Sequence, residues 1–132
     1  YIEYDVDSER RVTRLFWSYA EQQADGARFT DVIIQDNTFG TNRYGLPLCV
    51  FIGEDSNFKT IVLAQALVHK EDTAAFTWAY EHFRDSCCVK GAPPVMFLTD
   101  NNKAAASAIK AVVSDSEHFL CMWHMWRNIE KH

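Results

Sequence analysis

Two aspartates occupy equivalent places in this sequence. Asp36 follows the apolar residues that open VIIQDNTFGTN (32–42), and Asp100 ends VMFLTD (95–100). Each is followed directly by Asn. A single Asp after a strand is most often a turn residue or a helix cap. A matched pair raises a second hypothesis, that the two carboxylates act together in chemistry.

The chemistry open to such a pair is metal-assisted. Two carboxylates held close together repel each other, and a divalent cation relieves that repulsion. Hard carboxylate oxygens suit Mg²⁺ or Mn²⁺. Two such ions about 3.5–4 Å apart can activate a nucleophile and stabilise the leaving oxygen in phosphoryl transfer. We therefore predict that Asp36 and Asp100 bind Mg²⁺ or Mn²⁺, provided that the fold brings them to one edge of a sheet.

Hydrophobic periodicity predicts the elements that would position these acids. Strand patterns occupy residues 11–20, 31–39, 46–55, 58–69 and 95–100, with a short strand or turn at 117–123. Helical patterns occupy residues 20–29, 70–87, 101–113 and 124–132. Asp72 or Thr73 can cap the second of these helices, and Asn101 or Asn102 the third.

The connections between these elements predict the topology. Short turns join the strands between residues 31 and 69, which makes those strands antiparallel neighbours. The later strands are reached through helices, and such crossovers usually join parallel strands. The prediction is one α/β domain over residues 1–132, with a mixed sheet of three antiparallel strands followed by β-α-β-α units and flanking helices. Residues 1–10 are a candidate linker.

Composition excludes several classes of protein. The 132 residues are 48% hydrophobic and 23% charged, which is typical of a globular domain. No apolar run is long enough to span a bilayer, so we expect no membrane partner. A net charge of −5 argues against a free-standing, sequence-independent nucleic-acid binder. It does not exclude a site that reaches nucleic acid through metal ions.

The cysteines indicate the redox compartment, and the chain ends indicate whether the sequence is a whole protein. Cys49, Cys87, Cys88 and Cys121 do not form the spacing of a secreted disulfide framework, which favours a reducing intracellular compartment. The chain starts without Met and stops within a helical pattern. We expect it to be a fragment of a longer protein.

Four sequence blocks occur in a recognisable order, between about Arg11 and Asn128. They are FTDVIIQDNTFGTNRYGLPLCVFIG, ALVHKEDTAAFTWAYEHF, VMFLTDNNKAAASAI and FLCMWHMWRNI. Together they resemble the catalytic core of Mutator-like element (MULE) transposases, a group that includes the domesticated far-red-impaired-response transcription factors of plants. The resemblance implies a ribonuclease H-like fold and an Asp-Asp-Glu (DDE) catalytic triad.

The resemblance also implies roles for individual residues. The family's first acid maps onto Asp36 and its second onto Asp100, which are therefore the expected catalytic and metal-binding residues. The Cys-x-Trp-His block of the family maps onto Cys121, Trp123 and His124. The family's third acid lies on a helix well beyond that block, so the chain is expected to be truncated before the last catalytic helix. Two glutamates near the block do not match its position: Glu117 and Glu130.

The implied function is metal-dependent DNA strand cleavage and transfer, incomplete in this fragment, with Mg²⁺ or Mn²⁺ as cofactor. DNA would be reached through the full-length protein, in the nucleus or another intracellular compartment. The alternative is a domesticated domain that acts without catalysis, as a DNA-associated regulator or a protein-interaction scaffold. A homo-oligomer or a protein partner is a further candidate.

The end of the chain also contains three residues of the types that bind zinc. His118, Cys121 and His124 follow one another at intervals of three, and Cys-x-x-His is a legitimate zinc spacing. A structural zinc site needs four ligands, and no second clear pair follows, so zinc is not expected. Cys121 and His124 are kept as candidate accessory residues of the acidic site.

Overall fold

The computed structural model of the chain describes residues 1–88 and 92–130, with the backbone only at residues 127 and 128. The strands within this range are β1 (Ile2–Val6), β2 (Val12–Trp17), β3 (Val32–Thr38), β4 (Leu48–Glu54), β5 (Thr60–Val68), β6 (Met96–Thr99) and β7 (Glu117–Leu120). The helices are α1 (Ala20–Gly26), α2 (Thr73–Cys87), α3 (Lys103–Val112) and α4 (Met122–Glu130). None of the described helices is both long and apolar enough to cross a membrane.

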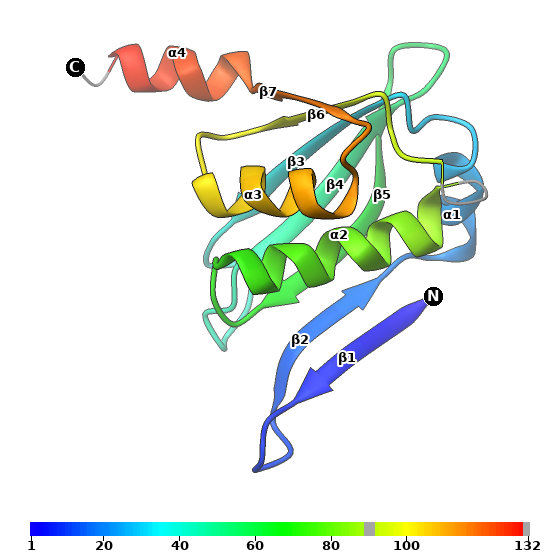
Figure 1. Cartoon of the computed structure of the whole chain (residues 1–132). Coiled ribbons are helices and arrows are strands. Elements are labelled where there is room, and N and C mark those ends of the chain that lie inside the picture. Colours follow the sequence, from blue (N-terminus) through cyan, green and yellow to red (C-terminus); the bar gives the residue numbers. More distant parts are fainter. Residues whose placement is uncertain (89–91, 131–132) are drawn as a thin grey trace.

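All the strands join one mixed sheet in the order β1-β2-β5-β4-β3-β6-β7. β3, β4 and β5 are antiparallel neighbours, as their short connections predict. β6 pairs with β3 in parallel, and β7 pairs with β6 in parallel, each after a helical crossover. The predicted mixed α/β sheet is therefore confirmed, and α2 and α3 lie together on one side of it (Figure 1).

Two segments differ from the prediction. Residues 1–10, expected as a candidate linker, contain β1, which pairs antiparallel with β2 from Ile2–Trp17 to Val6–Val12. The helix expected at 124–132 already begins at Met122, and its last two predicted residues lie outside the described residues. The caps are among those predicted, since Asp72 caps α2 and Asn102 caps α3.

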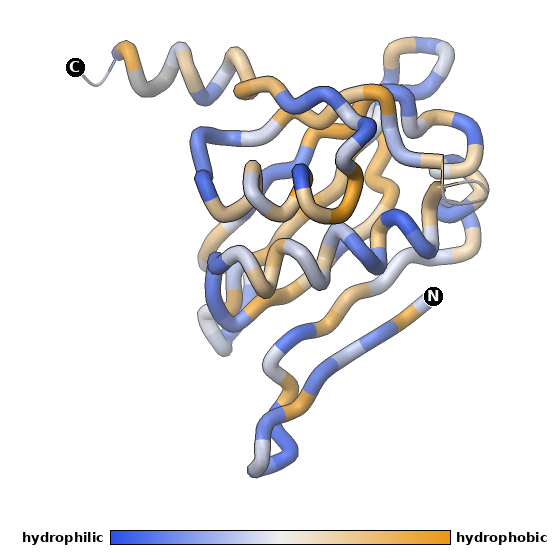
Figure 2. The backbone as a smooth tube through the Cα atoms, in the orientation of Figure 1, coloured by the Kyte–Doolittle hydropathy of each residue, from blue (hydrophilic) through white to orange (hydrophobic). Residues whose placement is uncertain are grey.

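The hydrophobic core lies between the sheet and the two helices α2 and α3. Phe51 of β4 stacks on Phe83 of α2 with 4.6 Å between ring centroids, and Phe97 of β6 packs edge-on against Tyr80 of α2. Each of these four side chains is at most 1% exposed. Burying one large apolar side chain contributes about 1.5–3 kcal/mol, so this core holds β3, β4 and β6 firmly in register. Hydrophobic residues accordingly concentrate in the central strands (Figure 2).

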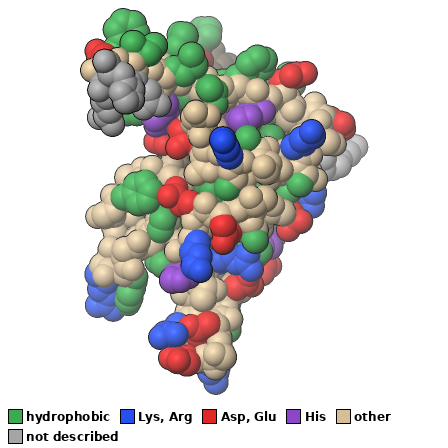
Figure 3. All heavy atoms as spheres, turned by 60° about the vertical axis from the view of Figure 1, so that its left-hand side comes forward, with side chains coloured by type: hydrophobic (Ala, Val, Ile, Leu, Met, Phe, Trp, Pro, Cys, Tyr) green, Lys and Arg blue, Asp and Glu red, His purple; other side chains and the backbone are tan. Residues whose placement is uncertain are grey.

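α4 stands apart from this core. It extends away from the end of the sheet (Figure 1), and hydrophobic side chains gather at this end of the molecule (Figure 3). Met122, Trp126 and Ile129 of α4 are 82%, 64% and 72% exposed. α4 is therefore held mainly through its first turn, which follows β7 directly.

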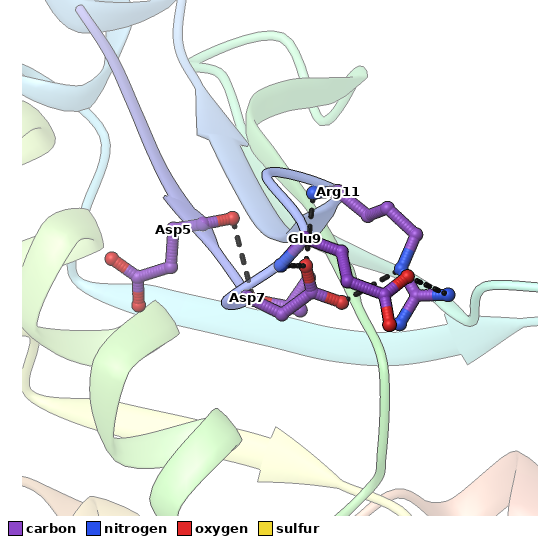
Figure 4. Close-up of polar contacts among 5 residues, drawn as sticks. Asp5, Asp7, Glu9 and Arg11 are labelled. Carbon is purple, nitrogen blue, oxygen red and sulfur yellow. Dashed lines mark hydrogen bonds and ion pairs between the residues drawn. The ribbon is translucent and has the colours of Figure 1, made fainter.

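The turn between β1 and β2 is organised by one carboxylate. Asp7 Oδ1 accepts hydrogen bonds from the backbone N–H groups of Glu9 (2.9 Å) and Arg11 (3.0 Å). Arg11 also donates from Nε to Asp7 Oδ2 at 2.8 Å (Figure 4). Arg10 adopts φ = 63°, the left-handed region that closes the turn. The hydrogen bonds from Arg11 lower the pKa of Asp7.

The turn between β4 and β5 repeats this arrangement. Asp55 Oδ1 accepts from the backbone N–H groups of Asn57 (2.8 Å) and Lys59 (3.0 Å). Phe58 takes the left-handed position with φ = 61°. The backbone hydrogen bonds from Lys59 and Asn57 lower the pKa of Asp55. Two hairpins of the sheet thus depend on the same turn chemistry, with Asp at its first position.

Candidate metal centre

The pairing of β3 with β6 positions the two predicted acids. The parallel register aligns Val32 with Met96 and Ile34 with Leu98. Continued by two residues, the same register sets Asp36 opposite Asp100. Both lie at the carboxyl ends of neighbouring parallel strands, the edge at which α/β sheets bind ligands. The pairing therefore leads both residues to the same edge of the sheet, which is the arrangement that the metal prediction requires.

Asp100 also has a local structural role. Its Oδ1 accepts a hydrogen bond from the backbone N–H of Asn102 at 3.2 Å. Asn102 in turn caps α3 by accepting from the N–H of Ala104 at 2.9 Å. Asp100 therefore lies beside the N-terminus of α3, where the helix dipole favours a negative charge. The turn role and a metal-binding role are compatible, because a carboxylate has more than one free lone pair.

His124 approaches Asp36 from α4. Its Nε2 lies 3.4 Å from Asp36 Oδ1. Asp36 is 37% exposed and His124 is 26% exposed, so the pair is half-buried. His124 Nδ1 is buried and has no hydrogen-bond partner among the described residues. The structure thus brings one of the two accessory candidates against the first acid.

Cys121 does not join this contact as a side chain. It is a free, half-buried thiol between β7 and α4. Its backbone carries the structural role, because Cys121 N–H donates to Thr99 O at 2.6 Å and Met125 N–H donates to Cys121 O at 3.1 Å. The residue therefore links the start of α4 to the end of β6, directly before Asp100.

The side chain of His118 contacts Thr99 at the end of β6. Its Nε2 lies 2.9 Å from the Oγ1 of Thr99, a fully buried residue. The Thr99 hydroxyl donates to Asp100 O at 2.8 Å, so His118 Nε2–H is the donor to Thr99. Burial lowers the pKa of His118, which favours this neutral form. His118 thus stabilises the backbone at Asp100 through the hydroxyl of Thr99.

A buried polar network supports the end of β3. Tyr80 OH donates to Gln35 Oε1 at 2.8 Å, and Gln35 Nε2 donates to Asn37 Oδ1 at 2.8 Å. Asn37 Nδ2 donates to Glu71. Burial raises the pKa of Tyr80, so the phenol stays a neutral donor. The network fixes the residues on either side of Asp36.

Sequence reasoning did not identify this network. The one signal was Gln35, a polar residue inside the apolar run VIIQD, which must find partners when buried. The sequence could not name Tyr80 as the partner, because helix and strand meet there only through the tertiary fold.

The donor chemistry of the site fits a hard cation with few protein ligands. Among the described residues, no group of three or more His, Cys, Asp or Glu side chains could hold one metal ion. Asp36 and Asp100 are therefore the two acids of the predicted site that this part of the chain supplies. Neither forms an ion pair with a described Lys or Arg side chain. Mg²⁺ commonly binds through one or two carboxylates and keeps several waters, so such a pair suits it.

Comparisons with known proteins agree on one family. The model of the MULE transposase domain matches residues 32–128. Protein FAR1-RELATED SEQUENCE 2 of Arabidopsis thaliana is 28% identical over 96% of this chain and 16% of its own length. Protein FAR-RED IMPAIRED RESPONSE 1 of the same plant is 29% identical over 97% of this chain and 15% of its own length. The chain thus spans about one sixth of the length of these relatives.

Proposed function

Because this chain belongs to the MULE transposase domain family, we propose that Asp36 and Asp100 are two acids of a metal-dependent site that cleaves and transfers DNA strands. One observation supports the proposal: β3 and β6 pair in parallel up to Ile34 and Leu98, so Asp36 and Asp100, each two residues further along, follow at the same edge of the sheet. The matched family model covers both residues, which is the independent support.

A ribonuclease H-like core is part of the proposal. The strands β5-β4-β3-β6-β7 give three antiparallel strands followed by two parallel ones, each reached through a helix. This is the strand order that the family resemblance implies. The hairpin of β1 and β2 extends the sheet at the β5 side.

The residues of this chain have separate roles in the proposed site. Asp36 and Asp100 would offer carboxylate oxygens to the cation, and His124 would hold Asp36 Oδ1 in place through its Nε2. When bound, Mg²⁺ or Mn²⁺ would supply Lewis acidity and an activated oxygen nucleophile for attack on a phosphodiester. The third acid would come from outside this chain, and DNA would be bound in the nucleus by the full-length protein.

A Mn²⁺ titration followed by NMR tests the site. Because Mn²⁺ is paramagnetic, its binding should broaden the amide signals of residues near Asp36 and Asp100 first. Asp36→Asn and Asp100→Asn should each weaken this effect strongly, because each removes one of two charged donors. Asp115→Asn, an exposed acid beyond α3, is the matched control and should leave it unchanged. Broadening that is equal in all four proteins would refute the metal site.

A non-catalytic role is the second candidate. It is favoured by the two-carboxylate donor set, since the described residues offer no third ligand. The domain would then act as a DNA-associated regulator or as a scaffold for protein partners. A plasmid-nicking assay with Mn²⁺ on the full-length protein, which would supply the third acid, separates the two functions. Nicking that disappears in Asp36→Asn and Asp100→Asn supports catalysis, whereas Mn²⁺ binding without any nicking favours the regulator.

A further inference from the structure

The two acids of the proposed site are held in different ways. Asp36 lies within β3 and takes part in its antiparallel pairing with β4, which fixes its backbone. Asp100 follows the last residue of β6. The pairing of β6 with β3 ends at Leu98, and its pairing with β7 ends at Thr99 and Leu120. The described strand pairs stop short of Asp100, so its position depends on the residues around it.

Thr99 is held through both of its polar groups. It is fully buried, and its carbonyl oxygen accepts a hydrogen bond from the N–H of Cys121 at 2.6 Å. Its Oγ1 accepts from Nε2–H of His118 at 2.9 Å and donates to the carbonyl oxygen of Asp100 at 2.8 Å. A hydroxyl has a single proton, so a donor on one side directs that proton to the other. His118 therefore directs the Thr99 hydroxyl towards the backbone of Asp100.

The register of β6 and β7 places His118 beside Thr99. His118 is aligned with Phe97, and Thr99 is two residues further along β6. Diagonal neighbours of this kind on one face of a sheet lie within reach of each other. The face is the core side, because Phe97 and Thr99 are both fully buried. An apolar residue of similar size would pack in the same place, so the hydrogen bond to Thr99 is what histidine adds here.

The contacts continue from the backbone of Asp100 to its carboxylate. Asp100 Oδ1 accepts from the N–H of Asn102 at 3.2 Å, which orients the carboxylate and leaves other lone pairs free. Groups that hold a metal-binding side chain without touching the metal commonly change metal affinity by about 10–100-fold. We propose that His118 and Thr99 are positioning residues, which hold the Asp100 carboxylate in the orientation that binds Mg²⁺ or Mn²⁺. This inference rests on the metal site proposed above and adds two residues to it.

A positioning role predicts a specific effect on the choice of metal. Mg²⁺ demands near-ideal octahedral geometry, with ligands at about 2.0–2.1 Å. Ca²⁺ accepts flexible geometry, with ligands at about 2.3–2.6 Å. A less well-placed Asp100 should therefore weaken Mg²⁺ binding more than Ca²⁺ binding. A general loss of stability would not discriminate between the two ions in this way.

Two pairs of variants of the 132-residue chain test the proposal. His118→Leu removes the N–H donor, and Thr99→Val removes the hydroxyl and keeps the shape. Each should weaken Mn²⁺ binding about tenfold in an NMR titration, and Mg²⁺ competition against Mn²⁺ should weaken more than Ca²⁺ competition. His118→Gln keeps an N–H and Thr99→Ser keeps the hydroxyl, so both should retain most of the affinity. Thr99→Val supplies the test if His118→Leu does not fold.

The matched control applies the same substitution to a different histidine. His82 of α2 is also partly buried, and its Nδ1 lies 2.8 Å from the hydroxyl of Tyr1 at the other end of the sheet. His82→Leu should leave both the Mn²⁺ affinity and the preference for Mg²⁺ over Ca²⁺ unchanged.

The amide of Asn102 gives a measurement that needs no metal. Its N–H donates to Asp100 Oδ1, so its NMR signal reports the orientation of that carboxylate. In the metal-free chain, His118→Leu and Thr99→Val should shift this signal and speed its hydrogen exchange, whereas His118→Gln should not.

The outcomes separate this inference from the proposed function. A wild-type chain that binds no Mn²⁺ would remove the metal site, and the positioning role with it. A wild-type chain that binds Mn²⁺ would leave the site standing. The positioning role alone is then overturned if His118→Leu and Thr99→Val keep the wild-type affinity, or if they leave the Asn102 amide signal unchanged.

Discussion

At the residue scale, the two Asp-led turns contain side chains in an unfavourable backbone region. Phe58 has φ = 61° and is 85% exposed, so packing of its side chain does not offset the strained backbone conformation. Left-handed backbone costs a non-glycine residue about 1–2 kcal/mol, whereas glycine adopts it freely. Part of that gain is offset by the greater freedom of glycine in the unfolded chain.

We therefore expect Phe58→Gly to raise the free energy of unfolding by about 0.5–1 kcal/mol. Urea denaturation followed by circular dichroism measures the change. Phe39→Gly is the control, because Phe39 is also exposed and does not have a positive φ. That control should lower stability slightly; an equal gain in both variants would contradict the role of the turn.

The Gln35 network supplies a second prediction for single residues. Tyr80→Phe removes the donor to Gln35 Oε1 and leaves that buried oxygen without this hydrogen bond. The expected loss is about 1–3 kcal/mol of unfolding free energy, measured by urea denaturation. Adding Gln35→Leu to Tyr80→Phe should recover part of that loss, since the orphaned polar group is gone. A fully additive double variant would show that the two residues are not coupled.

At the element scale, the strands that carry Asp36 and Asp100 were predictable because local pattern and connection rules agree there. The apolar runs before both acids indicate strands, and the helix before β6 indicates a parallel crossover next to β3. β1 was missed because its alternating residues, Ile2, Tyr4 and Val6, face away from the core and are exposed. The sequence of β1 contains no apolar run of the kind that marks a buried strand, so it could not be distinguished from a polar linker.

Contacts between elements that are distant in the sequence could not be predicted from it. His118 reaches Thr99 because β7 pairs with β6 in one particular register, and spacing alone does not set that register. His124 reaches Asp36 because Cys121 ties the start of α4 to Thr99. The motif indicated that these residues belong to the site, but the fold determines which acid each one supports.

The weak packing of α4 predicts that this whole helix opens easily. It has nine residues, and helices shorter than about 12–15 residues are marginal without tertiary packing. Its exposed Met122, Trp126 and Ile129 show how little packing it has. Amide hydrogen exchange should therefore be much faster in α4 than in α2, whose apolar face is buried. Comparable protection in the two helices would mean that α4 has a packing partner in solution.

At the scale of the whole molecule, the sheet has two unlike faces. The face under α2 and α3 holds the aromatic core, and this core fixes the register that sets Asp36 opposite Asp100. The other face contributes little to that core and carries an aliphatic row in which Val32, Ile34 and Val62 are exposed. One sheet thus combines a closely packed face with a face on which part of an aliphatic row is exposed among the described residues.

Acid should destabilise this molecule in two stages. Burial lowers the pKa of His118 below its ordinary value of 6.5, so the unfolded chain binds more protons and stability falls as pH drops below about 6.5. The pKa values of Asp7 and Asp55 lie below their ordinary 3.8. Their stabilising effect is complete above that value and is lost as pH falls through the folded pKa.

Urea midpoints measured from pH 3 to pH 8 should show both stages. His118→Gln has no titrating ring and can still offer an N–H to Thr99, so it should flatten the curve between pH 5 and pH 7. Asp55→Asn keeps a turn acceptor without the charge, so it should reduce only the loss near pH 3–4, and Asp115→Asn should change neither stage. If His118→Gln leaves the upper stage intact, another group must titrate there, and burial of a protonated His118 ring would not be the cause of the loss.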